Sequence, residues 1–360
     1  MLSYQNNELP TQYTTELIEY LCKHEFLKED PVVLVDVGCS GGLHPMWRVF
    51  GSDSLIAYGI DPISHEVDRL NEIEEYPRVN YYHYYVGLPE DHSLKAESAR
   101  YAGNAGITDI GETSGMQAVE SVAQKTNVPR NIKIGSMENP EANQITLDDF
   151  LGEQGISSVD YLKSDTDGFD IEVLHSAKEL LAKGELLGLC VETAMSGIGG
   201  KLHNGFTNVN ALIQEYDYTF FGFSSPANYT FSELPDLFEY NVFARTLRGM
   251  TLCANAIYMP DLVHRNLPIS DSRLLKVLCI YVLQGYHDWA AKIIKRKESQ
   301  LSSMGFDVSI LLDMITPKLF GKKINYENYI TIFKEKPELF LPKNKRQLEQ
   351  RLDFLCSSKG

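Results

Sequence analysis

Glycines and acidic residues that follow short apolar runs carry the chemistry of this sequence. Residues 35–42 read VDVGCSGG, so an apolar run passes directly into a glycine-rich loop. Glycines let the backbone pass close to a ligand, and the N-terminus of a following helix would present free N–H groups. Asp61 comes 19 residues after Gly42, the spacing at which a carboxylate meets ribose hydroxyls in nucleotide-binding α/β domains. The pattern predicts a site for a nucleotide or nucleoside.

The composition of this loop favours a cationic ligand over a phosphate. A dinucleotide site has a second glycine where this chain has Ser40, and Asp36 precedes the first glycine. An acid in the loop repels phosphate and suits a sulfonium amino acid. We therefore expect Asp36, Gly38, Ser40, Gly41 and Asp61 to bind S-adenosylmethionine rather than a nicotinamide dinucleotide.

A second group of candidates follows later apolar runs. Asp165 and Glu192 each come soon after such a run, and the carboxyl ends of parallel strands open onto one crevice. Transfer to a hydroxyl acceptor needs a base for its proton, or a metal that lowers its pKa. We take Asp165, Glu192 and His203 as candidate catalytic residues, with His44 a further candidate base.

Two carboxylates are too few to predict a metal centre, so magnesium is possible here but not predicted. If a metal is present, Asp165 and Glu192 are its expected ligands, because hard cations take oxygen. We expect Lys163 to pair with a neighbouring acid. The six cysteines are scattered, without a C-x-x-C pair, which argues against a disulfide framework or structural zinc and fits a reducing cytoplasm.

The elements that position these residues alternate between apolar runs and helical patterns. Continuous apolar runs are typical of strands that are buried on both faces, and seven of them alternating with helices predict a doubly wound α/β sheet. The runs are residues 32–37, 55–60, 79–86, 159–162, 186–191, 218–223 and 253–259, and the helical patterns between them include 62–75, a Thr146-capped helix, and 169–183. Tyr81–Tyr85 suits an aromatic strand, and stacking on a sugar remains open.

Two parts of the chain depart from this alternation. Residues 90–143 are rich in Gly, Asn, Ser and Thr and predict an insertion that covers an active site. Residues 268–360 predict a helical C-terminal region, with helices at 271–297, 308–314 and 347–356. We therefore divide the chain into an α/β domain at 1–267 and this region. The 271–297 helix is expected to pack on the core, an oligomer interface being the alternative.

The charge balance limits the partners. With 33 basic and 49 acidic residues, the formal net charge is −16, which argues against nucleic acid and against an anionic membrane surface. The densest apolar run, 277–283, is far shorter than the roughly 20 residues that a membrane helix needs, and residues 1–9 do not resemble a signal peptide. We expect a soluble cytoplasmic protein whose oligomeric state is open.

Residues 162–174, LKSDTDGFDIEVL, resemble the signature of the FkbM-type methyltransferases. The resemblance includes the TLDDF helix at 146–150 and the Val191-Glu192 strand end, and it spans about 30–262. Asp170 stands where the family usually has Glu. The resemblance implies a class I, Rossmann-like methyltransferase fold, dependent on S-adenosylmethionine, with strand order 3-2-1-4-5-7-6 and strand seven antiparallel.

The same resemblance implies specific roles. Asp36 and the backbone of residues 38–42 would hold the methionine portion of the cofactor, Asp61 its ribose, and the Gly87–Leu88 region would lie near adenine. The implied reaction is O-methylation of a sugar hydroxyl in a glycan or polysaccharide precursor. Two alternatives stay open, a nicotinamide-dependent sugar oxidoreductase and a non-catalytic member of the fold that binds a glycan or a partner.

Overall fold

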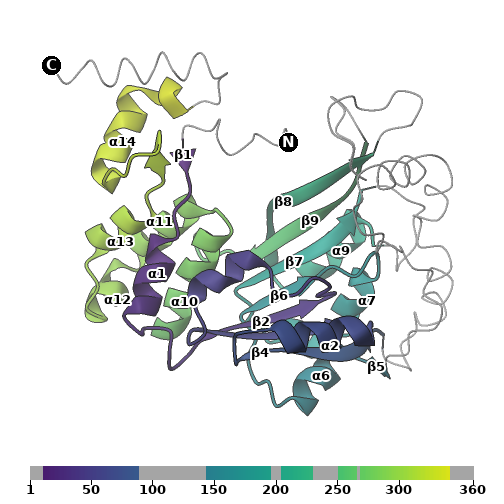
Figure 1. Ribbon diagram of the computed structural model, residues 1–360. Helices are drawn as coiled ribbons and strands as arrows, with labels where there is room; N and C mark the ends of the chain where they lie inside the picture. The colour runs from purple at the N-terminus through teal and green to yellow at the C-terminus, as the bar shows by residue number, and fades with distance from the viewer. Residues whose placement is uncertain (1–10, 89–142, 196–203, 230–249, 266–267, 341–360) are drawn as a thin grey trace, which may run out of the picture. The chain divides into compact units, whose positions relative to one another are not determined.

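The computed structural model describes residues 11–88, 143–195, 204–229, 250–265 and 268–340 (Figure 1). The chain forms two compact units. The α/β unit comprises residues 32–44 and 55–260, and the helical unit comprises residues 1–31, 45–54 and 261–360. The predicted insertion at 90–143, apart from Asn143, and the predicted helix at 347–356 lie outside the described residues.

The α/β unit contains an eight-stranded sheet in the order β5-β4-β3-β2-β6-β7-β9-β8. Its strands are β2 (Val32–Val37), β3 (Leu55–Asp61), β4 (Val79–Val86), β5 (Asn143–Ile145), β6 (Tyr161–Ser164), β7 (Gly188–Ala194), β8 (Tyr218–Tyr229) and β9 (Met250–Pro260). The strands from β5 to β7 are parallel, and β9 runs antiparallel to both of its neighbours. The predicted fold class and strand order are confirmed, with β5 as an additional edge strand beside β4.

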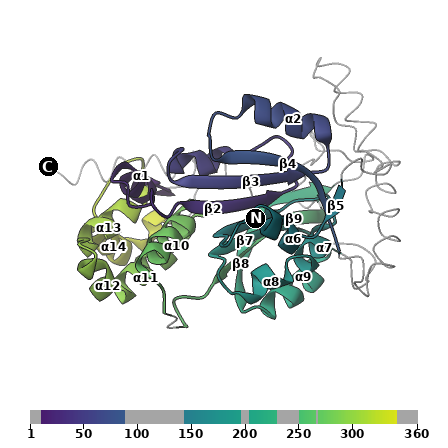
Figure 2. The ribbon, with the colours of Figure 1, turned by 90° about the horizontal axis from the view of Figure 1, so that it is seen from below.

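The apolar runs form strands because both faces of the sheet are covered. In β2, all residues except Val33 are buried, including Asp36. Figure 2 shows α2 (Ser64–Ile73) on one side of the sheet. On the other side lie α6 (Leu147–Glu153), α7 (Asp170–His175), α8 (Lys178–Ala182) and α9 (Phe206–Gln214). A doubly wound sheet of this kind opens its binding crevice at the carboxyl ends of the strands.

The segment predicted as one helix at 169–183 forms two helices. Thr146 caps α6 as expected, since its hydroxyl accepts a hydrogen bond from the backbone N–H of Asp149 at 3.0 Å. On the same helix, the Asp148 carboxylate accepts from the N–H groups of Glu179 (2.8 Å) and Leu180 (3.0 Å). These are free donors at the start of α8, so a carboxylate from a neighbouring helix satisfies them and stabilises a new helix start.

No α-helix follows the glycine loop directly, and the expectation of one was wrong. The next element is η1 (Pro45–Phe50), a 3₁₀ helix that belongs to the helical unit. Trp47 and Phe50 are buried with their rings stacked at 6.1 Å between centroids. Burial of these two apolar rings stabilises the segment after the loop.

The tyrosine-rich strand β4 uses its rings for packing. Tyr82 and Tyr84 both meet the ring of Phe150 on α6 edge-on, with centroids 5.2 and 5.9 Å apart. Strand packing is thereby confirmed for these two rings.

The helical unit contains a two-stranded ribbon and six α-helices among its described residues. They are β1 (Thr11–Gln12), α1 (Glu16–Lys23), α10 (Asp271–Leu283), α11 (His287–Arg296), α12 (Glu298–Ser303), α13 (Val308–Ile315), β10 (Lys318–Leu319), α14 (Tyr326–Glu335) and the 3₁₀ helix η2 (Pro337–Phe340). The predicted helix at 271–297 is divided at Gly285, whose φ of +84° is incompatible with a continuous helix. Residues 274–282 of α10 are buried.

The described residues include no helix that is long and apolar enough to cross a membrane. The division predicted at residue 267 lies close to the start of this unit's last segment, which begins at Asp261. The unit also takes in residues 1–31 and 45–54, which the sequence pattern does not separate from the sheet.

Candidate functional site

The glycine loop makes a backbone-to-backbone contact that only glycine allows. Gly38 follows β2 with φ +78°, and a Cβ built there would lie 1.9 Å from the backbone oxygen of Asp165. The ends of β2 and β6 therefore approach each other directly beneath the loop. Gly41 and Gly42 also have positive φ, which lets the loop turn sharply.

The backbone N–H groups of the loop all find partners within the protein. Gly38 and Cys39 donate to the Ile60 oxygen at 2.9 and 3.4 Å, and Gly42 donates to the Cys39 oxygen at 2.8 Å. The other three meet side chains. Ser40 donates to Asp61, Gly41 to Glu66 Oε1 at 2.9 Å, and Leu43 to the Tyr81 hydroxyl at 3.0 Å. The sequence predicted free donors at this point, and that expectation was wrong.

Two residues that anchor the loop were not expected from the sequence. Tyr81 accepts from Leu43 and donates its own hydroxyl proton to Glu74 Oε2 at 2.9 Å. Glu66 is also paired with Arg69, and this hydrogen bond lowers the pKa of Glu66 to about 2. An acid in the first turn of the helix after β3 is too common a feature to have identified Glu66 as a loop anchor. No feature of the run Tyr81–Tyr85 distinguishes Tyr81 from the other tyrosines.

Asp36 is engaged in an internal ion pair. Lys163 stands opposite Asp36 on the neighbouring strand β6, and its Nζ donates to Asp36 Oδ1 at 2.9 Å. Burial raises the pKa of Asp36 to about 6, and Lys163 opposes that rise. Lys163 Nζ also lies 3.6 Å from Asp165 Oδ2, so the pairing expected for Lys163 is confirmed. The role predicted for Asp36 toward a cofactor stays a prediction.

Asp61 lies at the end of β3, beside the loop. It is 3% exposed, and its carboxylate accepts from the N–H groups of Ser40 and Ile63, the latter at 3.0 Å. Burial raises its pKa. Ile63 is 43% exposed and offers an apolar surface next to this acid.

Gly87 and Leu88 follow β4 and are joined to β5. Gly87 N donates to the Ile145 oxygen at 3.0 Å, and Gln144 Nε2 donates to the Leu88 oxygen at 3.0 Å. The Leu88 side chain belongs to the buried core of the unit. Any contact of this segment with a ligand would therefore come from backbone atoms, and its predicted place near adenine stays a prediction.

Asp165 and Glu192 lie close enough to interact electrostatically. The Asp165 side chain is 35% exposed, and Glu192 is partly buried in β7. Burial, followed by the charges of Asp165 and Asp170, raises the pKa of Glu192 to about 8. Cys253 on β9 hydrogen-bonds to Glu192, and burial together with that carboxylate raises the pKa of the Cys253 thiol to about 12. The sequence had not linked Cys253 to this site.

The two candidate histidines differ in what the structure says of them. His203 lies outside the described residues, and His44 is exposed. No cluster of three or more His, Cys, Asp or Glu side chains within the described ranges is arranged to hold a metal ion.

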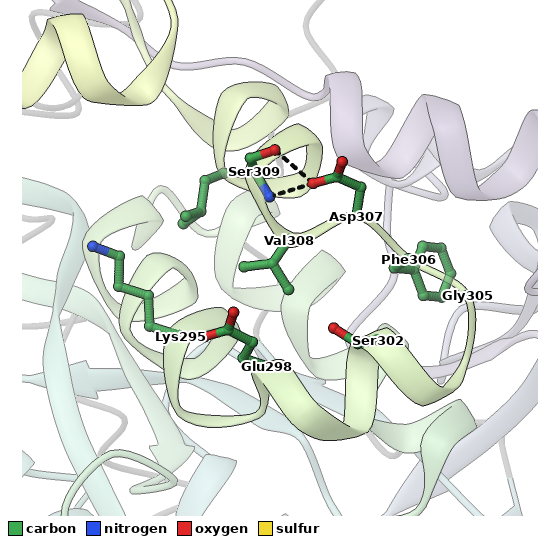
Figure 3. Close-up of a pocket in the computed structure, with 9 residues that line it drawn as sticks. Lys295, Glu298, Ser302, Gly305, Phe306, Asp307, Val308 and Ser309 are labelled. Carbon is green, nitrogen blue, oxygen red and sulfur yellow. Dashed lines mark hydrogen bonds between the residues drawn. The ribbon is translucent and has the colours of Figure 1, made fainter.

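The surface of the helical unit has a hollow (Figure 3). The residues that line it are far along the chain from the candidate site residues described above. It is lined by α11, α12 and the start of α13. Asp307 at its edge caps α13, accepting from the backbone N–H of Ser309 at 2.8 Å and from its hydroxyl. None of the predicted site residues lines it.

Comparisons with known proteins identify the class. Residues 56–220 match the family model of the methyltransferase FkbM domain. The resemblance found in the sequence is thereby confirmed, and this segment is a methyltransferase domain of the FkbM family. No curated protein gives a match to the chain.

Solved structures of methyltransferases are similar at low identity. Magnesium protoporphyrin IX methyltransferase from Synechocystis, solved with bound SAM, is 8% identical, with 69% of this chain and 79% of that chain covered and a TM-score of 0.26. A TehB-like methyltransferase from Corynebacterium glutamicum is 9% identical, with coverages of 68% and 88% and a TM-score of 0.27. These scores are too low to support an argument about function.

The close approach at Gly38 leads to a prediction about stability. Gly38→Ala should lower the free energy of unfolding by at least about 3 kcal/mol, because the new Cβ would overlap the Asp165 carbonyl. The matched control is Gly155→Ala, where φ is +64° but no atom lies within 4 Å. It should lose only about 1–2 kcal/mol, the cost of the left-handed backbone. Urea unfolding followed by circular dichroism measures both, and equal losses would contradict the close contact.

The raised pKa of Glu192 predicts a pH dependence of stability. The folded state holds the Glu192 proton up to about pH 8, whereas the unfolded state loses it near 4.5, so stability falls as pH rises through this window. Asp36 and Asp170, each with a pKa of about 6, act in the same direction at lower pH. Between about pH 6.5 and 8, Glu192→Gln should therefore flatten the slope, by up to about 1 kcal/mol per pH unit.

Urea titrations across that pH range test this expectation, with the exposed Glu153→Gln on α6 as the control. An unchanged slope in Glu192→Gln would show that Glu192 is ionised in the folded protein at neutral pH. The groups that face Glu192 are Asp165, Asp167, Asp170 and Cys253.

Proposed function

We propose that this chain is an S-adenosylmethionine-dependent methyltransferase that O-methylates a sugar hydroxyl in a glycan or polysaccharide precursor. The FkbM domain supports methyl transfer. The hydrogen bonds of the glycine loop and the acids around it support the choice of cofactor and acceptor.

The observation that carries the proposal is the internal hydrogen bonding of the glycine loop. A pyrophosphate is bound by free backbone N–H groups at such a loop and at a helix N-terminus. Here the N–H groups of residues 38–43 are engaged within the protein, and the next element is a 3₁₀ helix. Two of the engaged donors meet carboxylates, Asp61 and Glu66. This loop suits a ligand without phosphate, which disfavours the nicotinamide alternative.

The acids around the loop fit a cationic nucleoside. Asp61 lies at the strand end where a carboxylate accepts from ribose hydroxyls, and the exposed Ile63 beside it offers an apolar surface to a purine. Asp165 places further negative charge at the same sheet edge, and Glu192 adds its own once it is ionised. A sulfonium would be attracted to this group of carboxylates, whereas each added anion would be repelled.

In the proposed reaction the cofactor supplies an electrophilic methyl group. The chain's residues align the acceptor, exclude water and hold a proton. Glu192 is the candidate base for the acceptor hydroxyl, because its pKa of about 8 lies near the pH at which the protein would act. Asp165, which is more exposed, is the candidate for orienting that hydroxyl or the cofactor amine. Carboxylates that accept hydrogen bonds from several hydroxyls suit a saccharide.

Calorimetry tests the cofactor. We expect S-adenosylmethionine and S-adenosylhomocysteine to bind the full chain and NAD⁺ and NADH to give no heat of binding. Asp61→Asn should weaken S-adenosylhomocysteine binding about tenfold, because the ribose loses a charged acceptor. The exposed Asp68→Asn on α2 is the matched control and should bind as the wild type does. Binding of NAD⁺ but not S-adenosylmethionine would overturn the proposal.

Methyl transfer tests the acceptor. Tritiated S-adenosylmethionine should label at least one member of a panel of methyl glycosides of glucose, galactose, mannose, rhamnose and fucose. Asp165→Asn should lower kcat by at least about 100-fold, and Glu153→Gln should leave it unchanged. Cofactor binding without labelling of any glycoside would remove the saccharide from the proposal, and wild-type rates in Asp165→Asn would remove its assigned role.

A further inference from the structure

A buried carboxylate holds the backbone on both sides of Asp165. Asp170, the first residue of α7, is fully buried. Its Oδ1 accepts the hydroxyl proton of Ser164 at 2.6 Å and the backbone N–H of Thr166 at 3.1 Å. Since these are the two residues that flank Asp165, one carboxylate oxygen determines how Asp165 leaves the end of β6.

A buried amide connects this carboxylate to the strand that carries Glu192. Asn204 lies just before α9 and is 5% exposed. Its Nδ2 donates to Asp170 Oδ2 at 2.9 Å and to the backbone oxygen of Glu192 at 3.0 Å. Its Oδ1 accepts from Ile171 N at 3.1 Å. Both N–H groups and the oxygen of this amide are thus used between α7 and β7.

We infer that the Asp170–Asn204 pair is the positioning device of this site and sets the separation of Asp165 and Glu192. The inference rests on the proposed function, for which these two acids act on the acceptor. Neither Asp170 nor Asn204 is placed to touch a ligand, because both side chains are buried and engaged within the protein. They act through the backbone of the two residues that do.

The charges of Asp165, Asp170 and Glu192 explain why their positions must be held. Burial raises the pKa of Asp170 to about 6, and the charges of Asp165 and Asp170 disfavour ionisation of Glu192. When Glu192 gives up its proton, it becomes a like charge near Asp165, and like charges move apart unless the backbone holds them. Hydrogen bonds on both sides of Asp165 and on the Glu192 carbonyl resist that separation. An error of about 1 Å in such a geometry lowers turnover about 100-fold.

Two variants separate positioning from folding. Asn204→Ala removes the amide from Asp170 and from the Glu192 carbonyl. The exchange Asp170→Asn with Asn204→Asp restores the hydrogen bond between positions 170 and 204, and keeps acceptors for Ser164, Thr166 and Ile171. It places a carboxylate oxygen against the Glu192 carbonyl, so that hydrogen bond is replaced by a repulsive contact. Asn210→Ala on α9 is the matched control, since Asn210 Oδ1 has no hydrogen-bond partner among the described residues.

The experiment measures thermal unfolding, S-adenosylhomocysteine affinity and steady-state transfer to the methyl glycoside that the wild type labels fastest. In Asn204→Ala we expect kcat to fall about 10- to 100-fold while the dissociation constant for S-adenosylhomocysteine changes less than about threefold. The exchanged pair should regain part of the lost thermal stability but not kcat. Asn210→Ala should match the wild type in kcat.

Crystal structures of the wild type and both variants supply a measurement that needs no activity. The distance between the carboxyl carbons of Asp165 and Glu192 should change in Asn204→Ala and in the exchanged pair, and should stay constant in Asn210→Ala. An unchanged distance, or wild-type kcat in Asn204→Ala or in the exchanged pair, would overturn the inference. If the wild type neither binds S-adenosylhomocysteine nor labels a glycoside, the proposed function fails, and the distance still decides whether the pair positions the two acids.

Discussion

Two neighbouring parallel strands bring opposite charges to the base of the site, and the surrounding residues are arranged around that pair. Asp36 and Lys163 stand opposite each other in register, and the Lys163 ammonium also reaches the backbone oxygen of Gly38 at 3.5 Å. A carboxylate buried in a sheet requires a partner of this kind, because an unpaired charge there would be strongly destabilising. Lys163 thus joins the glycine loop to the strand that presents Asp165.

The close approach of β2 and β6 has a consequence for the ligand. With Gly38 against the Asp165 carbonyl, the loop turns back toward β3 and α2, where Ile60, Asp61 and Glu66 accept its N–H groups. The loop that binds phosphate in many α/β proteins here presents carboxylates at its edge instead of donors. In the proposed function, this hydrogen bonding within the protein adapts a topology that suits nucleotides in general to a ligand that carries positive charge.

The acids of the site are held together against their mutual repulsion. Burial and the charge of Asp165 raise the pKa values of Asp170 and Glu192, and hydrogen bonds from Ser164 and Asn204 keep the strand ends in place. In the proposed function, a bound cation would offset the repulsion between the ionised acids of this site. Its two more exposed carboxylates differ in environment, and such differences allow one acid to orient an acceptor while another takes its proton.

The amino-acid sequence alone was sufficient to predict seven of the eight strands of the sheet, because a long apolar run such as Val32–Val37 has few alternatives to a buried strand. The FkbM resemblance supplied the strand order. Tertiary structure decided the rest. The edge strand β5, the break between α7 and α8, and the 3₁₀ helix after the loop depend on side chains that meet across the fold. The Asp170–Asn204 pair and the Tyr81 anchor join residues 34 and 38 positions apart. No local pattern encodes such hydrogen bonds, because a buried donor and its acceptor are matched by three-dimensional proximity rather than by spacing along the chain.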